Sequence, residues 1–270
     1  MKLGLVVHRT RPSAATTAAT CLQAAAEMGI DLIGLEGGPA IRGLTTGPLD
    51  GVEGIIAIGG DGTVLESARL ALSLDCPLLG INVGRLGFLA EVPADRVRET
   101  FARMVSQDYT IESRMTLAAS RGRGEPVSAL NDVVVGKQLG ERLASITVEV
   151  DGEKFHTFRA DGVVVASPTG STGYAFSAGG PVLSPQLEAI LLIAVAPHAS
   201  FNRALVFPAT SRLRLRAATH RPLRVSIDGR DEGHLEKDGW VDVGRGESPV
   251  RFFDLGIHAF PHFIERLPDL

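Results

Sequence analysis

The first 110 or so residues alternate short apolar runs with helical patterns. Continuous apolar runs of strand length lie at 3–7, 31–35, 54–58 and 78–82. Between them, apolar residues recur at helical spacing over 16–28, 64–74 and 95–105, and Gly29 follows the first of these segments as a helix-ending residue. Alternation of this kind predicts a parallel sheet with helices on both faces.

The rest of the chain is rich in β-branched residues and short turns. Strand patterns lie at 111–119, 129–135, 146–150, 154–159, 162–166, 213–216, 224–227, 240–243 and 250–254. The sequence Val150-Asp151-Gly152-Glu153 is a hairpin signal. We therefore predict an α/β fold: an N-terminal Rossmann-like parallel-sheet domain, residues 1–110, followed by a β-rich, mostly antiparallel domain, residues 111–255. A tail, residues 256–270, is apolar near its start, and we expect it to pack back on the first domain.

Composition narrows the class of protein. The 270 residues carry a net charge of −4 and are 44% hydrophobic, which is typical of a globular protein. The chain has no polybasic segment of the kind that binds nucleic acid. Its apolar runs are all much shorter than the ~20 residues that span a bilayer. The two cysteines, Cys21 and Cys76, have no metal-ligand spacing. We expect a cytoplasmic protein without a membrane or nucleic-acid partner.

The segment Gly59-Gly60-Asp61-Gly62-Thr63 is the first candidate for chemistry. It follows a predicted buried strand and precedes a predicted helix, which is where open α/β sheets bind ligands. Glycines and a helix N-terminus suit phosphate, but a carboxylate repels it. Asp61 therefore needs another role: accepting a hydroxyl proton or holding a divalent cation. The alternative is that Asp61 only caps the helix.

Further polar segments lie in the second half. The strand 162–166 leads into Ser167-Pro168-Thr169-Gly170-Ser171-Thr172-Gly173-Tyr174, a loop with many N–H and O–H donors that suits phosphate and ribose. Asn131-Asp132 precedes an apolar strand and by itself indicates only a turn. His198 by itself is more typical of a structural histidine. No HExxH or CxxC pattern indicates a protein-built metal site.

In this order the segments resemble the NAD kinase family, which makes NADP from NAD with ATP or polyphosphate. The matching segments are Gly59–Thr63, Leu130–Asp132, Arg159–Gly162, Pro168–Tyr174, Ser177–Pro181 and Pro197-His198. The Thr-Gly-Ser-Thr block followed by Ala-Gly-Gly-Pro is the specific part, whereas the first motif is shared with lipid kinases and phosphofructokinases. The resemblance covers about residues 54–230.

The resemblance implies a role for each matching residue. NAD would lie between the two domains, with Asp61 as general base on the adenosine ribose 2′-hydroxyl and Gly62 beside it. Asn131 and Asp132 would hold ribose or adenine, and Arg159 and Asp161 would contact the nicotinamide end. The adenine-side loop would be Thr172, Gly173, Tyr174, Ala175, Phe176 and Ser177, and Asn202 and Arg230 would line the same site.

The resemblance also implies partners and leaves alternatives open. A divalent cation such as Mg²⁺ would come with the phosphate donor, since Mg²⁺ takes few protein ligands. Family members form dimers or tetramers in which neighbouring subunits complete the site. The chain departs from the family at two positions: Asp132 stands where the family usually has Glu, and Glu66 stands where a basic residue is usual. The second departure affects the expected contacts to the phosphate donor more than the binding of NAD. The alternatives are a lipid kinase and a non-catalytic NADP(H) sensor.

Overall fold

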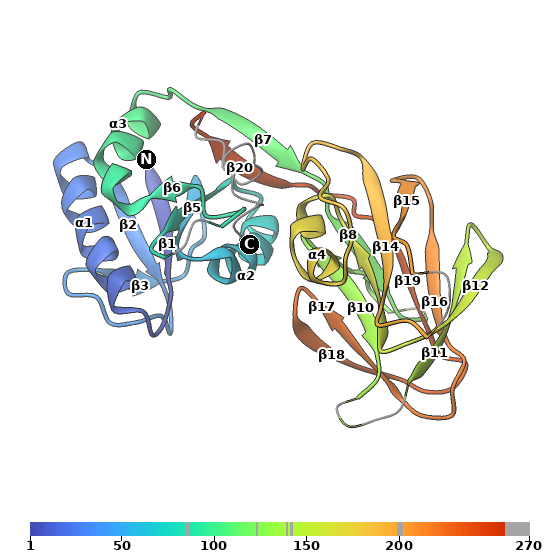
Figure 1. The fold of residues 1–270 in the computed structure, drawn as a ribbon. Coiled ribbons are helices and arrows are strands. Elements are labelled where there is room, and N and C mark those ends of the chain that lie inside the picture. Colours follow the sequence, from blue (N-terminus) through green and yellow to red (C-terminus); the bar gives the residue numbers. More distant parts are fainter. Residues whose placement is uncertain (85–86, 123, 139, 141–142, 199–201, 257–270) are drawn as a thin grey trace. The chain divides into compact units, whose positions relative to one another are not determined.

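The computed structural model describes residues 1–84, 87–122, 124–138, 140, 143–198 and 202–256. The chain forms two compact units (Figure 1). The first unit contains Met1–Ser113 and the segment 250–256, and the second contains Arg114–Pro249. The first unit therefore consists of two pieces of sequence.

The first unit is built around a parallel sheet. Its strands run in the order β3-β2-β1-β4-β5-β20-β7, with β6 paired to β5. The elements are β1 Lys2–Val7, α1 Pro12–Met28, β2 Asp31–Leu35, β3 Thr45–Gly47, β4 Gly54–Gly59, α2 Asp61–Ser73, β5 Leu78–Asn82, β6 Val92–Pro93, the 3₁₀ turn Ala94–Arg96, α3 Val97–Val105, β7 Thr110–Arg114 and β20 Val250–Asp254.

The connections of this sheet run outward from its centre. The chain passes from β1 through α1 to β2 on one side, and from β4 through α2 to β5 on the other. Strands β1 and β4 are neighbours, so the point where the strand order reverses lies between their carboxyl ends. In Figure 1, α1 and α3 lie side by side, and both contribute to an apolar cluster with Leu3, Leu5, Ile56 and Ile58.

Two features of this unit differ from the sequence interpretation. Residues 36–51 carry neither an apolar run nor a helical pattern, yet they contain the short strand β3. Strand β20 was expected in the second domain, but it pairs in parallel with β5, joining Phe252 to Leu78. An apolar strand pattern does not specify which sheet the strand joins. The expected tail lies outside the described residues from 257 onward.

The second unit consists mainly of antiparallel strands. Its elements are β8 Leu117–Ser120, β9 Val127–Ala129, β10 Asp132–Gly136, β11 Ala144–Val150, β12 Glu153–Ala160, β13 Gly162–Ala166, the 3₁₀ turn Thr169–Thr172, α4 Tyr174–Ser177, β14 Ala189–Val195, β15 Leu205–Pro208, β16 Leu213–Ala217, β17 Leu223–Ile227, β18 Arg230–Leu235 and β19 Trp240–Arg245. Within the described residues these strands form two sheets, β15-β14-β13-β10-β17-β18 and β12-β11-β16-β19-β8-β9.

The two sheets enclose one apolar core. Val133, Val163 and Leu192 of the first sheet and Ile146 and Leu215 of the second belong to the same buried cluster. The opposite face of β13 and β14 is also apolar and packs with Ala175 of α4. Burial on both faces explains the continuous apolar sequences of these two strands. The predicted fold class, a parallel α/β part and an antiparallel β-rich part, is confirmed.

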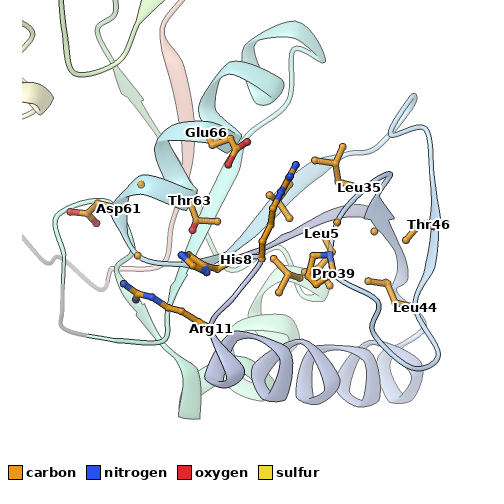
Figure 2. A pocket seen from close by; sticks show the side chains of 17 residues that line it. Leu5, His8, Arg11, Leu35, Pro39, Leu44, Thr46, Asp61, Thr63 and Glu66 are labelled. Atoms are coloured by element: carbon orange, nitrogen blue, oxygen red, sulfur yellow. The ribbon is translucent and has the colours of Figure 1, made fainter. Parts of the chain in front are cut away.

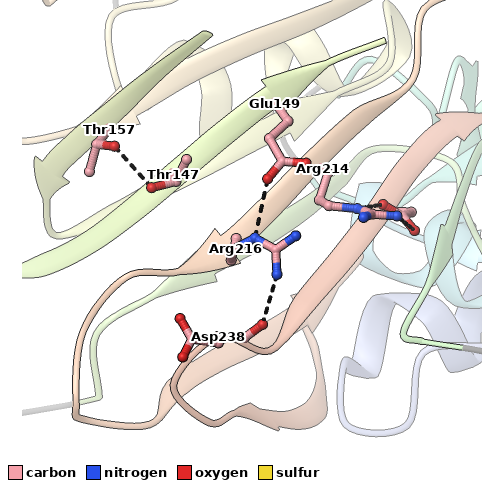
Figure 3. A network of polar contacts seen from close by, with 7 residues as sticks. Thr147, Glu149, Thr157, Arg214, Arg216 and Asp238 are labelled. Carbon is pink, nitrogen blue, oxygen red and sulfur yellow. Dashed lines mark hydrogen bonds and ion pairs between the residues drawn. The ribbon is translucent and has the colours of Figure 1, made fainter. Parts of the chain in front are cut away.

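Strand β16 alternates buried leucines with arginines on the opposite face of the sheet. Leu213 and Leu215 are buried, while Arg214 and Arg216 point to the other face. Arg214 donates two hydrogen bonds to Asp242, and Arg216 donates one to Glu149 (Figure 3). Both guanidinium groups also lie about 5 Å from the Trp240 ring. The two arginines are therefore paired with acidic residues of the same sheet.

Candidate active site

The segment Gly59–Thr63 joins β4 directly to α2. Gly60 is the helix N-cap residue, and Asp61 is the first residue of the helix. A Cβ added to Gly59 would lie 2.1 Å from Thr63 Oγ1, so the tight connection requires glycine there. Gly62 is exposed, and a Cβ added to it would meet no atom within 4 Å. The space around Gly62 is open to a ligand.

The Asp61 carboxylate binds a distant loop and does not cap its own helix. Oδ2 accepts the backbone N–H of Phe88 at 2.9 Å. Oδ1 accepts the N–H groups of Leu89 at 3.0 Å and Ala90 at 3.2 Å. No side chain caps α2, so the capping alternative does not describe this residue. Since a carboxylate oxygen accepts about two hydrogen bonds, contacts with the described residues fill both positions of Oδ1 and leave one on Oδ2.

Gly87 holds the same loop against Asp61. A Cβ added to Gly87 would lie 2.0 Å from Asp61 Oδ1 and 2.6 Å from Oδ2. No side chain fits in that space without moving the carboxylate or the loop. Gly87 is therefore part of the arrangement that orients Asp61.

A cavity of about 360 Å³ lies beside Asp61, at the carboxyl ends of β1 and β4 (Figure 2). Its two sides differ in chemistry. The side next to Asp61 is polar and includes His8, Arg11 and Thr63 (Figure 2), and Arg9 and Glu66 also line the cavity. The other side is largely apolar, formed mainly by Leu5, Leu35, Pro39 and Leu44. The cavity lies wholly within the first unit, at the reversal of strand order.

In the second unit, Asn131 and Asp132 lie against the turn that follows β13. A Cβ added to Gly170 would lie 2.0 Å from the Asn131 carbonyl oxygen. A Cβ added to Gly173 would lie 3.5 Å from Asn131 Nδ2 and 3.8 Å from Asp132 Oδ2. These glycines allow the loop dense in hydroxyls to approach the Asn-Asp pair. The structure therefore brings two of the sequence-predicted segments together.

Asp228 organises the backbone of this corner. Its carboxylate accepts the N–H groups of Leu130 at 2.9 Å, Asn131 at 2.8 Å and Asp132 at 3.2 Å. Burial, with a contribution from the Asp228 charge, raises the pKa of Asp132 to about 7. The Asn131 side-chain oxygen is buried and accepts no hydrogen bond within the described structure. A buried acceptor without a donor is rare and marks a place for a ligand group.

The segment Thr172–Ser177 combines exposed and buried side chains. Tyr174 and Ser177 are exposed, and Thr172 and Phe176 are partly buried. Ala175 is fully buried in the apolar cluster under β13 and β14. The side chain of Ala175 therefore fixes α4 to the sheet.

Arg159 and Asp161 lie at the opposite end of the β10–β13 strand pair from Asp132. Asp132 pairs with Ala166, whereas Gly136 pairs with Gly162, directly after Asp161. Four residues of strand separate the two ends by about 14 Å. Asp161 forms an ion pair with Lys137 at 2.6 Å, and the Arg159 carbonyl accepts the N–H of His198 at 2.8 Å. The predicted residues of this unit thus form two groups.

Asn202 and Arg230 lie on exposed segments of the second unit. Asn202 is in the connection between β14 and β15, and Arg230 begins β18 two residues after Asp228. Arg230 is therefore adjacent in sequence to the Asn131–Asp132 corner, while Asn202 stands apart from both groups along the chain.

The described residues contain no group of three or more His, Cys, Asp or Glu side chains placed to hold a metal ion. Among the same residues, every helix is too short or too polar to cross a bilayer.

Comparison with known proteins identifies the family. Residues 45–109 match the family described as the ATP-NAD kinase N-terminal domain, and residues 130–255 match the ATP-NAD kinase C-terminal domain. NAD kinase 2 of Streptomyces avermitilis is 38% identical over 97% of this chain and 91% of its own length. NAD kinase of Moorella thermoacetica is 37% identical over 81% and 72%. This chain belongs to the NAD kinase family.

Solved structures agree with that assignment. An Archaeoglobus fulgidus NAD kinase in complex with ATP is 26% identical, covers all of both chains and has a TM-score of 0.81. Yeast NADH kinase in complex with NADH has a TM-score of 0.88, covers 100% of this chain and 88% of its own, and shares the fold at 22% identity.

Membership of the NAD kinase family resolves the main alternatives. The chain is a phosphotransferase that converts NAD to NADP, which confirms the predicted activity. A lipid kinase would explain only the Gly-Asp-Gly segment, whereas the C-terminal match spans residues 130–255.

Sequence reasoning missed several residues of the candidate site. It did not find His8, Arg9 and Arg11 beside Asp61, nor Gly87, nor Asp228. A basic cluster directly after the first apolar strand, at the same sheet edge as Gly59, is a signal that could have indicated the first three. Gly87 and Asp228 act through contacts 26 and 96–98 residues distant in sequence, so no local pattern reveals them.

Proposed function

We propose that this NAD kinase transfers the terminal phosphoryl group of ATP, or of polyphosphate, to the 2′-hydroxyl of the adenosine ribose of NAD. Asp61 would act as the general base. The observation that carries this role is the single acceptor position left on Asp61 Oδ2 beside a cavity and an open glycine. The three N–H groups hold the carboxylate in one orientation, which is what a positioned base needs.

The chemistry follows from these contacts. Phosphoryl transfer depends on positioning and charge stabilisation more than on covalent catalysis. The ribose oxygen would attack the terminal phosphorus of the donor, and its proton would go to Asp61 Oδ2. The bond between that phosphorus and the bridging oxygen would break, leaving ADP or a shortened polyphosphate.

For NAD binding, we assign the corner at Asn131 and Asp132 to ribose or adenine. The unpartnered Asn131 oxygen can accept a hydroxyl or amino hydrogen. Thr172, Gly173, Tyr174, Ala175, Phe176 and Ser177 would line the adenine side, with Gly62, Asn202 and Arg230 as further contacts. For Ala175 the contact would be through its backbone, because its side chain is buried.

A divalent cation such as Mg²⁺ would enter with the donor phosphates. The residues present fit such an ion, because Glu66 lines the cavity and hard cations take oxygen ligands, most of which the donor phosphates and water would supply. Bound there, the ion would neutralise charge on the donor phosphates.

We also propose a homodimer or homotetramer. Arg159 and Asp161 lie about 14 Å along the strand pair from Asp132, so either one extended NAD reaches both groups or a second copy supplies Arg159 and Asp161. Exposed apolar side chains on the second unit, including Phe155 and Val206, suit an interface between copies. Light scattering tests this proposal: a monomer at micromolar concentration with full activity would contradict it.

The cytoplasm is the proposed compartment. Cys21 and Cys76 are both buried and unpaired, which suits a reducing environment. NAD and the phosphate donor are the proposed partners, without nucleic acid or membrane.

An end-point assay for NADP formation tests the proposed function. The protein is incubated with NAD and Mg²⁺, with ATP in one reaction and polyphosphate in another. We expect NADP with at least one donor and none without a divalent cation. NADP formation in the presence of EDTA would contradict the proposed metal requirement.

A further inference from the structure

From the contacts that hold the backbone of residues 130–132, we infer that Asp228 is a positioning residue for NAD. Its carboxylate fixes this segment so that the side chains of Asn131 and Asp132 are presented to the substrate together. The inference rests on the proposed assignment of the Asn131–Asp132 corner to NAD. It goes further because it names a residue, about 97 positions away in sequence, that acts on NAD through this corner.

Asp228 and Ser167 bind every backbone polar group of residues 130–132. The Asp228 carboxylate accepts the three N–H groups at 2.8–3.2 Å, and the Asp228 N–H donates to the Asp132 carbonyl at 2.9 Å. Ser167 is buried, and it donates its hydroxyl to the first carbonyl of the segment and its N–H to the second, at 2.9 Å. A buried N–H without an acceptor is unfavourable, so the segment keeps this conformation because the carboxylate is there.

With the backbone occupied in this way, the side chains of the corner are left for a ligand. The side-chain oxygen of Asn131 is buried and accepts no hydrogen bond from the described residues. A Cβ added to Gly173 would lie 3.5 Å from Asn131 Nδ2 and 3.8 Å from Asp132 Oδ2, so the two polar groups lie beside the same glycine. The backbone between them sets their relative orientation, and Asp228 holds that backbone.

A second Asp-Gly turn in the same unit serves as a structural reference. Asp228-Gly229 joins β17 to β18 with φ values of 49° and 74°, and Asp151-Gly152 joins β11 to β12 with φ values of 52° and 88°. Asp151 accepts the N–H of Arg212 at 2.8 Å and donates its own N–H to the Arg212 carbonyl at 2.9 Å. Contact with one residue is therefore enough for such a turn. Asp228 extends the same contact over three consecutive residues, and two of them are the proposed NAD contacts.

The test makes the same substitutions in both turns. Asp228→Asn keeps one acceptor oxygen and tolerates a positive φ, but its NH₂ group cannot accept, so at least one of the three N–H groups loses its acceptor. Asp228→Gly removes the whole carboxylate and leaves the turn unstrained, because glycine adopts a positive φ readily. Asp151→Asn and Asp151→Gly are the matched controls.

Asn131→Ala, alone and combined with Asp228→Gly, tests whether Asp228 acts through the corner. For each protein, kcat, KM for NAD, KM for the phosphate donor and the melting temperature are measured. The two KM values separate positioning of NAD from a general loss of folded protein, because unfolding lowers the active fraction without changing either KM.

We expect the effects to be graded and confined to NAD. KM for NAD should rise about ten- to a hundred-fold in Asp228→Gly and about three- to ten-fold in Asp228→Asn, since more N–H groups lose their acceptor in the first variant. KM for the donor should stay near the wild-type value in both. The Asp151 variants should keep both KM values even where their melting temperatures fall. In Asn131→Ala/Asp228→Gly, KM for NAD should lie well below the product of the two single effects, because both changes remove the same contact.

The possible failures overturn different statements. If Asn131→Ala keeps the wild-type KM for NAD, the assignment of the corner to NAD is wrong and the positioning role falls with it. If Asn131→Ala raises KM for NAD but the Asp228 variants do not, the assignment stands and the positioning role is wrong. Equal KM values in the Asp228 and Asp151 variants would show that Asp228 only stabilises its turn.

Two further outcomes also decide the proposal. If the single effects of Asn131→Ala and Asp228→Gly multiply in the double variant, Asp228 affects NAD independently of the corner, and the proposal is wrong. If Asp228→Gly does not fold, Asp228→Asn takes its place in every comparison, including the double variant. An unchanged KM for NAD in Asp228→Asn would then overturn the positioning role.

Discussion

Asp61 and Asp132 occupy comparable places in the two units but are held differently. Each lies at the end of a buried strand, Asp61 directly after Gly60 at the end of β4 and Asp132 at the start of β10. The Asp61 carboxylate receives three backbone N–H groups. At the second site the three N–H groups go to Asp228, and Asp132 is buried beside it with its pKa raised to about 7.

The comparison shows that the supply of backbone N–H groups decides what a buried carboxylate can do. Backbone N–H donors replace the water that a carboxylate loses on burial, and their hydrogen bonds stabilise its charged form. Where a neighbour takes those donors, burial favours the neutral acid instead. The first arrangement fixes the orientation of the Asp61 carboxylate, and the second suits a group that binds ligand hydroxyls.

Replacing Asp61 by Asn gives the largest expected effect. It removes the base, and loss of a general base lowers rates by ~10²–10⁴-fold, so kcat for NADP formation should fall by that factor. NAD affinity, measured by calorimetry, should change much less. A variant that keeps more than about a tenth of wild-type kcat would contradict the general-base role.

Asp61→Asn should also lower the melting temperature, whereas replacing a helix-capping Asp by Asn would leave it unchanged. The amide NH₂ cannot accept the N–H that Asp61 now accepts at Oδ1 or Oδ2. Asn caps helices as well as Asp does. An unchanged melting temperature would show that the contacts with residues 88–90 contribute little.

Gly87→Ala tests the orientation of Asp61 without changing its chemistry. The new Cβ would lie 2.0 Å from Oδ1, so the carboxylate or its loop must move. A displacement of about 1 Å can cost ~10²-fold in rate, and we expect a fall of that order in kcat. Gly47→Ala is the matched control, because a Cβ there meets no atom within 4 Å. Equal activity of both variants would mean that the loop moves freely away from Asp61.

Asp132→Ala should weaken NAD binding. A hydrogen bond contributes ~0.5–1.5 kcal/mol between neutral groups and ~1.5–3 kcal/mol with a charged one, which together correspond to about two- to a hundred-fold in Kd. Asp132→Asn is the matched control, since the amide keeps the size and hydrogen-bonding capacity of the neutral acid. If Asp132→Ala leaves Kd and KM for NAD unchanged, Asp132 has only a structural role.

The last prediction concerns the pH dependence of stability. The folded chain holds the Asp132 proton up to about pH 7, whereas the unfolded chain releases it near 3.8. Stability from this group is therefore fully present below pH 3.8 and is lost as pH rises through 7, by up to ~1.4 kcal/mol per pH unit. Denaturant unfolding between pH 4 and 8 should show a shallower fall for Asp132→Asn than for wild type. Parallel curves would place the pKa near its ordinary value.

The fold could be predicted from the sequence where an element is marked by its own residues. The bounds of β2, β5 and β13 agree with their apolar runs, and Gly29 ends α1 at a positive φ of 69°. The start of α2 was expected at 64, but the helix begins at Asp61. A glycine-rich segment disfavours helix by propensity, and the fixed geometry of the loop overrides that preference.

The sequence indicated which residue types form the candidate site, but it did not indicate the contacts that hold them in place. The Gly-Asp-Gly segment indicated Asp61, but its three N–H donors lie 27–29 residues further on. Arg159 and Asp161 stand in sequence near the other second-unit residues, yet the register of β10 with β13 puts them at the far end of the strand pair. Long-range pairing of this kind depends on the whole sheet and leaves no local signal.

Because β20 lies near the end of the chain, the first unit is completed late in synthesis. The ribosome completes β5 by residue 82, but the strand that pairs beside it starts at Val250, after the entire second unit. The edge of β5 where β20 belongs stays without that strand while some 170 residues are made, and unpaired strand edges attract other chains. The sheet of the first unit is therefore completed only after the second unit has been synthesised. A chain that ends before Val250 would lack β20 and could not complete this sheet.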